Sequence, residues 1–312
     1  MNVFNDKSLL EEVAAIKNIS ASFVEKDWHA VQVIRKVYEF SYRGFEIIFS
    51  GGTALSKAHK IIQRFSEDVD FRVQTNLLEG TSKSHQRKVL SDFKNAVIVH
   101  LRTEFEIEDS KIVATDSNHF FSVELDYPTL FPQSVVLRPH LLIEFKLSRL
   151  FLDAQSFPVS SFINELSRKA PEVPDMTCAN SVEIAIDKYS ALLWRIPQRE
   201  EDIKNSVEIP DDRNIVRHLH DLYYLHNSAI SYPDFKTLML RTIQEDDNRS
   251  KSIAGLSIKE KFGIVLDILK NDKKYLHEYD HFVKGMSYAV GSLPEYHNAI
   301  TAFEQLSEHL LD

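Results

Sequence analysis

Two aspartates separated by one residue mark the stretch of this chain that could do chemistry. Asp68 and Asp70 stand in Asp-Val-Asp-Phe-Arg-Val, which alternates polar and apolar residues as a β-strand does. In a strand these side chains share one face, and adjacent carboxylates repel unless a cation lies between them. Mg²⁺, which uses one or two carboxylates together with substrate phosphates, suits such a pair, with Mn²⁺ as the alternative ion. On its own, the motif also suits an exposed strand face.

A glycine pair lies just upstream of the aspartates. Gly51 and Gly52 end the β-rich run at residues 45–50, and a helix is expected over residues 54–62 with Thr53 as its N-cap. The chain holds only 8 glycines among 312 residues, so two in succession indicate a special backbone requirement. Free N–H groups at such a helix start can receive an anion. A purely structural turn is the alternative interpretation.

A further acid is expected from a later strand. Residues 141–147 are apolar apart from Glu144 and Lys146, and an acid in a strand suited to the core needs a partner. A metal ion shared with the two aspartates would supply that partner. Glu124 and Asp126, on the preceding strand, compete for the same role.

Two charged side chains stand out in the second half of the chain. Lys188 lies on the apolar stripe of a predicted helix, so it must either extend to solvent or meet an anion. Asp221 follows Arg217 by four residues on another helix, where a local ion pair is the simplest interpretation. His218 and His220 are two residues apart and do not share a helix face, which excludes a zinc pair.

The wider pattern predicts an α+β chain with two domains, residues 1–150 and 151–312. The first domain would combine helices and strands, and the second would be all-helical after a proline- and serine-containing connection at residues 151–179. In the first domain, helices are expected at 6–41 and 81–104, and strands at 45–50, 68–73, 105–114, 120–127 and 141–147. In the second, helices are expected at 181–195, 212–227, 233–246, 257–270, 273–289 and 294–310.

Two groups of charged residues have plain structural interpretations. Glu25, Lys26 and Asp27 read as a solvated cluster near a helix start. The helix at 81–104 is the most basic stretch of the first half, and it reads either as a solvated face or as an edge that faces RNA or a triphosphate. Its basic residues are Lys83, His85, Arg87, Lys88 and Lys94.

Bulk properties exclude several classes of protein. The net charge of −9 argues against a protein that coats nucleic acid through a general basic field, although a local basic patch stays compatible with it. The sequence contains no run of 18 apolar residues, so no membrane span is expected, and the N-terminus lacks the apolar core of a signal peptide. With Cys178 as the one cysteine, no intrachain disulfide can form, and a cytoplasmic location is expected.

The order of these motifs resembles the AbiEii/AbiGii toxin family. Members are nucleotidyltransferases of the DNA polymerase β superfamily that act as toxins in abortive-infection (phage defence) and type IV toxin–antitoxin systems. The resemblance is strongest between residues 22 and 74 and extends more loosely to Glu144, to Glu183 with Lys188, and to the helix of Asp221. It rests on Glu25-Lys26-Asp27-Trp28, Phe49-Ser50-Gly51-Gly52-Thr53-Ala54-Leu55-Ser56-Lys57 and Arg64-Phe65-Ser66-Glu67-Asp68-Val69-Asp70.

The resemblance implies a polymerase β-like mixed sheet followed by a helical domain that closes the nucleotide cleft. It implies Asp68 and Asp70, helped by Glu144, as Mg²⁺ ligands. Lys188 would face the nucleotide, and Asp221 would lie in the same cleft. His218 departs from the family pattern, because relatives often carry an acid there. The residues implied to cradle the triphosphate, or to lie near it, are Ser50, Gly51, Gly52, Thr53, Lys57, Arg64 and Ser66.

The expected reaction is transfer of a nucleotidyl group from an NTP to an acceptor hydroxyl. The resemblance implies the 3′ end of tRNA as acceptor, with blocked translation and growth as the result, and an antitoxin encoded nearby as partner. Two alternatives stay open: an enzyme that modifies a protein or a small molecule, and a non-catalytic NTP-binding module. No residue pattern identifies the base of the NTP.

Overall fold

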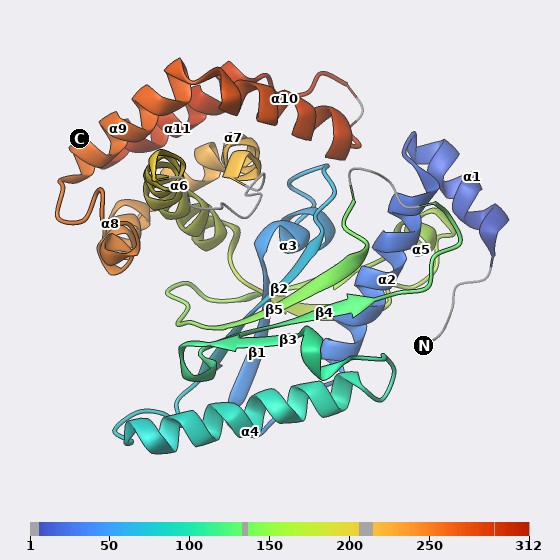
Figure 1. The fold of residues 1–312 in the computed structure, drawn as a ribbon. Coiled ribbons are helices and arrows are strands. Elements are labelled where there is room, and N and C mark those ends of the chain that lie inside the picture. The colour runs from blue at the N-terminus through green and yellow to red at the C-terminus, as the bar shows by residue number, and fades with distance from the viewer. Residues whose placement is uncertain (1–5, 133–136, 206–214, 290, 312) are drawn as a thin grey trace. The chain divides into compact units, whose positions relative to one another are not determined.

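The computed structural model describes residues 6–132, 137–205, 215–289 and 291–311 (Figure 1). Its contacts divide the chain into two compact units, Met1–Asn180 and Ser181–Asp312. Residues 151–179, expected to connect the domains, instead contain two strands and a short helix of the first unit. Pro158 did not prevent strand formation because it lies in an edge strand, at an irregularity of the pairing where a backbone N–H is dispensable.

A seven-stranded mixed sheet forms the centre of the first unit, with strand order β3-β4-β5-β2-β1-β7-β6. The pairs β2/β5 and β1/β7 are parallel, and the other neighbours are antiparallel. The strands are β1 Phe45–Ser50, β2 Asp68–Thr75, β3 Ile112–Thr115, β4 Phe120–Asp126, β5 His140–Leu147, β6 Gln155–Val159 and β7 Val173–Cys178.

One face of this sheet is an aromatic core. Phe71 stacks on Phe145, with ring centroids 5.2 Å apart, and Phe145 stacks on Phe121 at 4.7 Å. Phe93 of the long helix α4 stacks on Phe45 at 4.2 Å, so α4 covers this face. The helices of this unit are α1 Lys7–Lys17, α2 Ala21–Tyr38, α3 Gly51–Lys57, α4 Lys83–Leu101 and α5 Phe162–Leu166.

Several element boundaries differ from the prediction. The helix expected over residues 6–41 is divided into α1 and α2, because Asn18 ends α1 in the left-handed backbone conformation. Residues 105–114 form a strand only from Ile112 onward, because the Arg102 side chain donates to the carbonyl of Ile107 at 2.8 Å and ties this segment to the end of α4. Helix α3 begins at Gly51 and ends at Lys57, whereas residues 54–62 were expected to be helical.

The second unit is helical over its described residues, as predicted. The helix that begins at Ser181 continues to Lys204, well beyond its predicted end at residue 195, and contains Pro197. The other helix bounds lie close to the predicted ones. No helix among the described residues has the length and apolar character that a membrane span needs. The helices are α6 Ser181–Lys204, α7 Ile215–Ile230, α8 Phe235–Glu245, α9 Ile258–Asn271, α10 Lys273–Met286 and α11 Tyr296–Leu311.

Candidate active site

Three strands bring a row of polar side chains to the sheet face opposite the aromatic core. Asp70 of β2 is paired with Ser50 of β1 on one side and with Glu144 of β5 on the other. Paired residues of neighbouring strands project to the same face, so these side chains lie next to one another. Asp68 joins them two residues back along β2. The register therefore brings the two predicted aspartates and the predicted third acid together.

The competing acids of β4 lie one strand further away. Glu124 is paired with Leu142 and Asp126 with His140, so the whole of β5 separates them from β2. The carboxylate of Asp126 is exposed and pairs with Lys111. Of the three candidates for a third acid, Glu144 has the position closest in register to Asp70.

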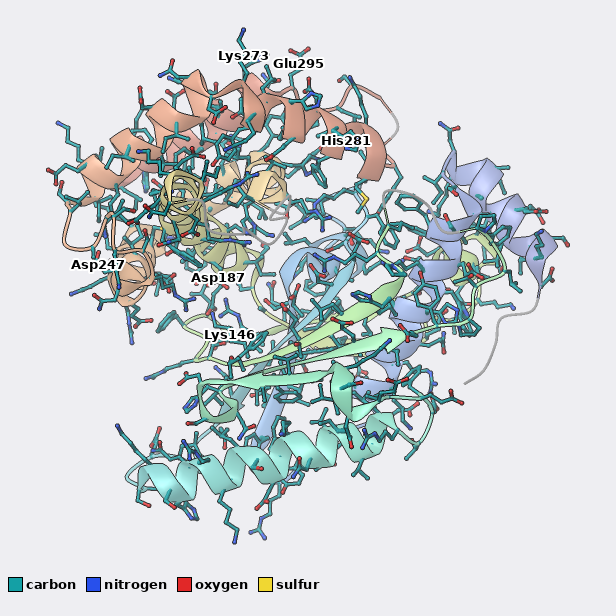
Figure 2. All side chains as sticks on the ribbon, in the orientation of Figure 1. Lys146, Asp187, Asp247, Lys273, His281 and Glu295 are labelled. Carbon is teal, nitrogen blue, oxygen red and sulfur yellow. The ribbon has the colours of Figure 1, made fainter. Side chains whose placement is uncertain are left out.

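Cations follow the acids on the same sheet face. Arg72 stands two residues after Asp70 in β2. It is paired in register with Lys146 of β5, which is labelled in Figure 2. Along β2, this face therefore carries carboxylates beside the glycine turn and cationic side chains further on. Carboxylates suit a metal ion and cationic side chains suit a polyanion, and both kinds share one surface.

The glycine turn lies directly against Asp70. Gly51 has φ +73°, a backbone conformation that other residues adopt only with strain. A Cβ at this position would stand 2.0 Å from Oδ2 of Asp70. Glycine is therefore required here both for the turn and for the close approach of the carboxylate.

Gly52 leaves room for two further predicted residues. A Cβ at position 52 would stand 2.6 Å from Nη2 of Arg64 and 2.9 Å from Oγ of Ser66. Arg64 is buried and its Nη1 donates to the carbonyl of Phe65 at 3.0 Å. A guanidinium and a hydroxyl thus face the turn on one side while Asp70 faces it on the other.

Thr53 has a different position from the one predicted. It lies inside α3, and the N-cap of this helix is Ser50. The hydroxyl of Thr53 donates to the backbone carbonyl of Asp68. Thr53 therefore ties the start of α3 to the strand of the aspartates. The sequence could not show this contact because it depends on how α3 packs against β2.

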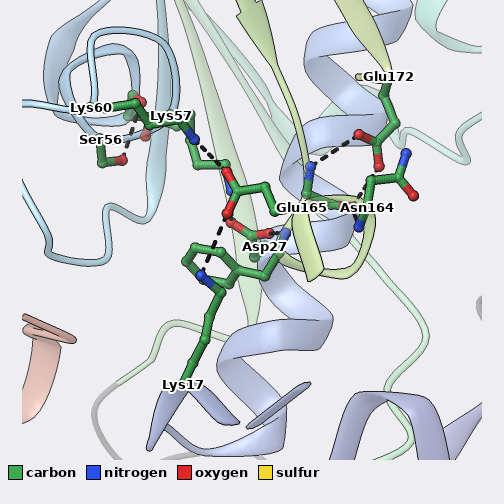
Figure 3. A network of polar contacts seen from close by, with 11 residues as sticks. Lys17, Asp27, Ser56, Lys57, Lys60, Asn164, Glu165 and Glu172 are labelled. Carbon is green, nitrogen blue, oxygen red and sulfur yellow. Dashed lines mark hydrogen bonds and ion pairs between the residues drawn. The ribbon is translucent and has the colours of Figure 1, made fainter. Parts of the chain in front are cut away.

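Lys57 is buried at the end of α3 and pairs with Asp27 of α2 (Figure 3). Its Nζ lies 2.7 Å from Oδ1 of Asp27 and 4.0 Å from the centroid of the Phe162 ring. The other carboxylate oxygen of Asp27 accepts from the backbone N–H of Phe162 at 2.7 Å. Burial raises the pKa of Asp27, and the Lys57 ammonium opposes that rise. This geometry makes the pair a support that joins α2, α3 and α5.

The solvated cluster predicted at Glu25, Lys26 and Asp27 is wrong, because all three side chains are buried. Nζ of Lys26 lies 3.0 Å from Oε1 of Glu67, the residue that precedes Asp68. Burial lowers the pKa of Lys26, and the Glu67 carboxylate opposes that change. Three successive helical residues span more than half of the helix circumference, so some of these charges had to face the interior. That spacing was the missed signal.

Arg138 is a residue of this site that the sequence did not indicate. Its Nη1 lies 2.8 Å from Oδ1 of Asp68. The acids suit a divalent ion by their chemistry, since Asp68, Asp70 and Glu144 share one face and Gly51 leaves space at Asp70. Within the described ranges, however, no three His, Cys, Asp or Glu side chains are gathered closely enough to hold a metal ion.

In the second unit, Lys188 and Asp221 form a buried ion pair. Nζ of Lys188 lies 2.7 Å from Oδ2 of Asp221, and Nδ1 of His220 lies 3.3 Å from the other oxygen. The two predicted residues are therefore together, and Lys188 meets an anion instead of extending to solvent. The Asp221 charge also helps to raise the pKa of Tyr279, although burial is the larger cause.

The basic helix α4 lies on the wrong face to contact a triphosphate at the acids. Its buried residues, which include Phe93, pack against the aromatic face of the sheet, whereas Asp70 projects from the opposite face. Arg87 and its basic neighbours Lys83 and Lys88 are exposed. The solvated interpretation of this helix agrees with the structure.

Comparison with known proteins shows what this chain is similar to. A family model described as "Nucleotidyl transferase AbiEii toxin, Type IV TA system" matches residues 41–306. The nucleotidyltransferase toxin MenT4 from Mycobacterium tuberculosis H37Rv aligns with a TM-score of 0.54 and 12% identity, over 96% of this chain and 88% of that chain. A candidate nucleotidyltransferase from H. pylori aligns with a TM-score of 0.42 and 14% identity, over 92% and 93%. No curated protein matches the sequence. The MenT4 likeness supports the α+β fold.

Proposed function

Because the chain belongs to the AbiEii family of type IV toxin–antitoxin nucleotidyltransferases, we propose that the row of Ser50, Asp70 and Glu144 is its catalytic centre. The reaction is transfer of NMP from an NTP to an acceptor hydroxyl: the hydroxyl oxygen bonds to the α-phosphate, the bond between the α- and β-phosphates breaks, and pyrophosphate and the hydroxyl proton are released. The observation that carries this assignment is the contact between Asp70 and the turn at Gly51. This contact places a carboxylate that suits a metal ion beside a helix start that suits an anion.

Asp68 and Asp70 would hold Mg²⁺, or Mn²⁺, together with the phosphates of the substrate, and Glu144 would help them from β5. The ion would supply neutralisation of charge on the phosphates and orientation of the reacting groups. This chain's own contribution is to keep the carboxylates on one face through the β2/β5 register. Thr53, by its hydrogen bond to the Asp68 carbonyl, keeps that strand against α3.

The turn would receive the triphosphate. Ser50 caps α3, and the N–H groups that follow it belong to the first turn of this helix, where an anion is stabilised. Arg64 and Ser66 lie against Gly52 and offer a positive charge and a hydroxyl to the same group. We leave Lys57 out of the phosphate-binding group because its ammonium is buried against Asp27.

Lys188 and Asp221 would contribute from the helical unit. Lys188 would stabilise charge on the phosphates, and Asp221 would orient the lysine or the acceptor. Their mutual contact supports a shared role, since a lysine in a buried, specific ion pair is held in one position.

The acceptor proposed here is the 3′ end of tRNA. Modification of that end, in the cytoplasm, would block translation until a cognate antitoxin acts. This part rests on the family membership. A protein or small-molecule acceptor is the alternative, and the acidic net charge of −9 slightly favours it.

Labelling tests the proposal directly. Each α-labelled NTP is incubated with wild-type protein and with separate tRNA, protein and small-molecule pools, in Mg²⁺ or in chelator. We expect label at tRNA 3′ ends that is lost in chelator and in Asp68→Asn and Asp70→Asn. Asp126→Asn, a matched acid on β4, should retain activity. Transfer that survives in Asp70→Asn would overturn the catalytic assignment, and label in another pool alone would overturn the tRNA acceptor.

A further inference from the structure

The guanidinium of Arg138 lies against Asp68, one of the two aspartates, although Arg138 belongs to no recognised motif. Arg138 stands just before β5, and its Nη1 lies 2.8 Å from Oδ1 of Asp68. The side chain of Arg138 is 34% exposed and that of Asp68 is 20% exposed. Solvent therefore reaches this pair, in contrast to the buried pair of Lys57 and Asp27.

The backbone of Arg138 is fixed on both sides. Its N–H donates to the carboxylate of Glu67, and its carbonyl accepts from Nζ of Lys26 at 3.0 Å. Lys26 and Glu67 are themselves a buried pair, 3.0 Å apart. The main chain is thus anchored to the residue next to Asp68, while the long side chain extends from that anchor into a partly exposed position.

We infer that Arg138 is a phosphate-binding residue of this centre, which pairs with Asp68 before substrate arrives and contacts the triphosphate of the NTP afterwards. The inference rests on the catalytic function proposed for Asp68, Asp70 and Glu144. It adds a residue that neither the sequence motifs nor the resemblance supplies.

Charge balance is the physical reason for the exchange. Asp68, Asp70 and Glu144 place three carboxylates on one face, and the Arg138 guanidinium offsets part of their repulsion. A divalent cation at Asp68 would replace that guanidinium. The triphosphate that enters with the cation then offers a new anionic partner, and the planar guanidinium can bind two phosphate oxygens at once.

This exchange predicts opposite effects on two ligands. Arg138 competes with a metal ion for Asp68, so Arg138→Gln should bind Mn²⁺ alone several-fold more tightly. The same variant loses a phosphate contact, so it should bind a Mg²⁺ complex of a non-hydrolysable NTP about tenfold more weakly. Arg138→Lys keeps the charge but not the two-pronged geometry, and its NTP affinity should be intermediate.

Calorimetry of the full chain tests both effects. Mn²⁺ alone and each of the four α,β-methylene NTPs with Mg²⁺ are titrated into wild type, Arg138→Gln, Arg138→Lys and Arg87→Gln. Arg87 is an exposed arginine of α4, on the other side of the sheet, and its variant should match wild type. Thermal unfolding confirms that each variant is folded.

The outcomes separate the inference from the function on which it rests. If Arg138→Gln binds the NTP analogue as tightly as wild type, or binds Mn²⁺ no more tightly, the proposed role of Arg138 is overturned. The catalytic function proposed for Asp68, Asp70 and Glu144 is then unaffected. If wild type binds no NTP analogue, and Asp70→Asn leaves nucleotide transfer unchanged, the proposed function itself is overturned.

Discussion

The Asp70 carboxylate occupies the space that a side chain at position 51 would need: a Cβ on Gly51 would stand 2.0 Å from Oδ2 of Asp70. The φ of +73° at Gly51 adds a second requirement for glycine. One residue therefore shapes the helix start and also allows the carboxylate to approach it. The contact links the two motifs, which are separate in the sequence.

Gly51→Ala should abolish transfer and also destabilise the first unit. The left-handed backbone costs an alanine about 1–2 kcal/mol, and the clash forces either Asp70 or the turn to move. Gly80 supplies the control, because it has φ +67° but nothing within 4 Å of its added Cβ. Gly80→Ala should lose a similar amount of stability, measured by urea unfolding, and keep its activity. If the two variants lose activity equally, strain alone accounts for the effect.

Local patterns accounted for much of the fold but for few of its long-range pairs. The alternation around Asp68 and Asp70 predicted their shared face, and the acid in an apolar strand singled out Glu144. The contacts that support these acids join distant positions: Lys26 bonds to the carbonyl of Arg138, 112 residues away. Such partners depend on tertiary packing, which no periodicity in one segment encodes. The same limitation hid the burial of Glu25, Lys26 and Asp27.

The pair of Asp27 and Lys57 should behave as a support and not as a phosphate site. Asp27→Ala leaves the Lys57 ammonium buried and unpaired, which costs about 3–5 kcal/mol. The double variant Asp27→Leu/Lys57→Met removes both charges and should recover most of that loss. It should keep a deficit of about 1–3 kcal/mol, because the N–H of Phe162 loses its acceptor.

Urea unfolding in a Trp194→Phe background measures this stability, because Trp28 then reports on the first unit alone. The KM for NTP of the double variant is the second readout. An unchanged KM agrees with a supporting role. A rise of tenfold or more would show that Lys57 contacts phosphate after all.

His29 should make the first unit less stable in mild acid. Burial lowers the pKa of its imidazole from 6.5 to about 4, its Nδ1 has no hydrogen-bond partner among the described residues, and its ring packs on Tyr127 at 4.6 Å. The unfolded chain takes up a proton as the pH falls below about 6.5, whereas the folded chain does so only near 4. The contribution of neutral His29 to the unfolding free energy is therefore fully present above pH 6.5. It is lost progressively as the pH falls to 4, by about 3 kcal/mol in total.

His29 also makes a hydrogen bond to the backbone of Pro128. His29→Gln keeps a donor for that bond and removes the titration. The difference in unfolding free energy between the variant and wild type should change by about 3 kcal/mol between pH 7.5 and pH 4. The exposed His85 of α4 is the control, and His85→Gln should show no such change. A pH dependence that is identical in wild type and His29→Gln would exclude His29 as its source.

Stability and activity should separate at Lys188 and Asp221. Lys188→Met leaves Asp221, whose side chain is fully buried, without its ammonium partner, and should destabilise the second unit by about 3–5 kcal/mol. The double variant Lys188→Met/Asp221→Leu should recover much of this stability, followed through Trp194 in a Trp28→Phe background. If the pair also acts on the nucleotide, transfer should stay at least about a hundredfold below wild type in the double variant.

The second unit contains a matched pair that no part of the proposed mechanism uses. Arg199 of α6 binds Glu278 of α10 through two contacts, at 2.6 and 2.8 Å. Arg199→Gln/Glu278→Gln should lose stability but keep nucleotide transfer, because this pair joins α6 to α10 and has no role in the proposed mechanism. Recovery of both stability and transfer in the Lys188/Asp221 double variant would reduce that pair to the same structural role. Recovery of stability without transfer requires that at least one of the two charges acts in the reaction itself.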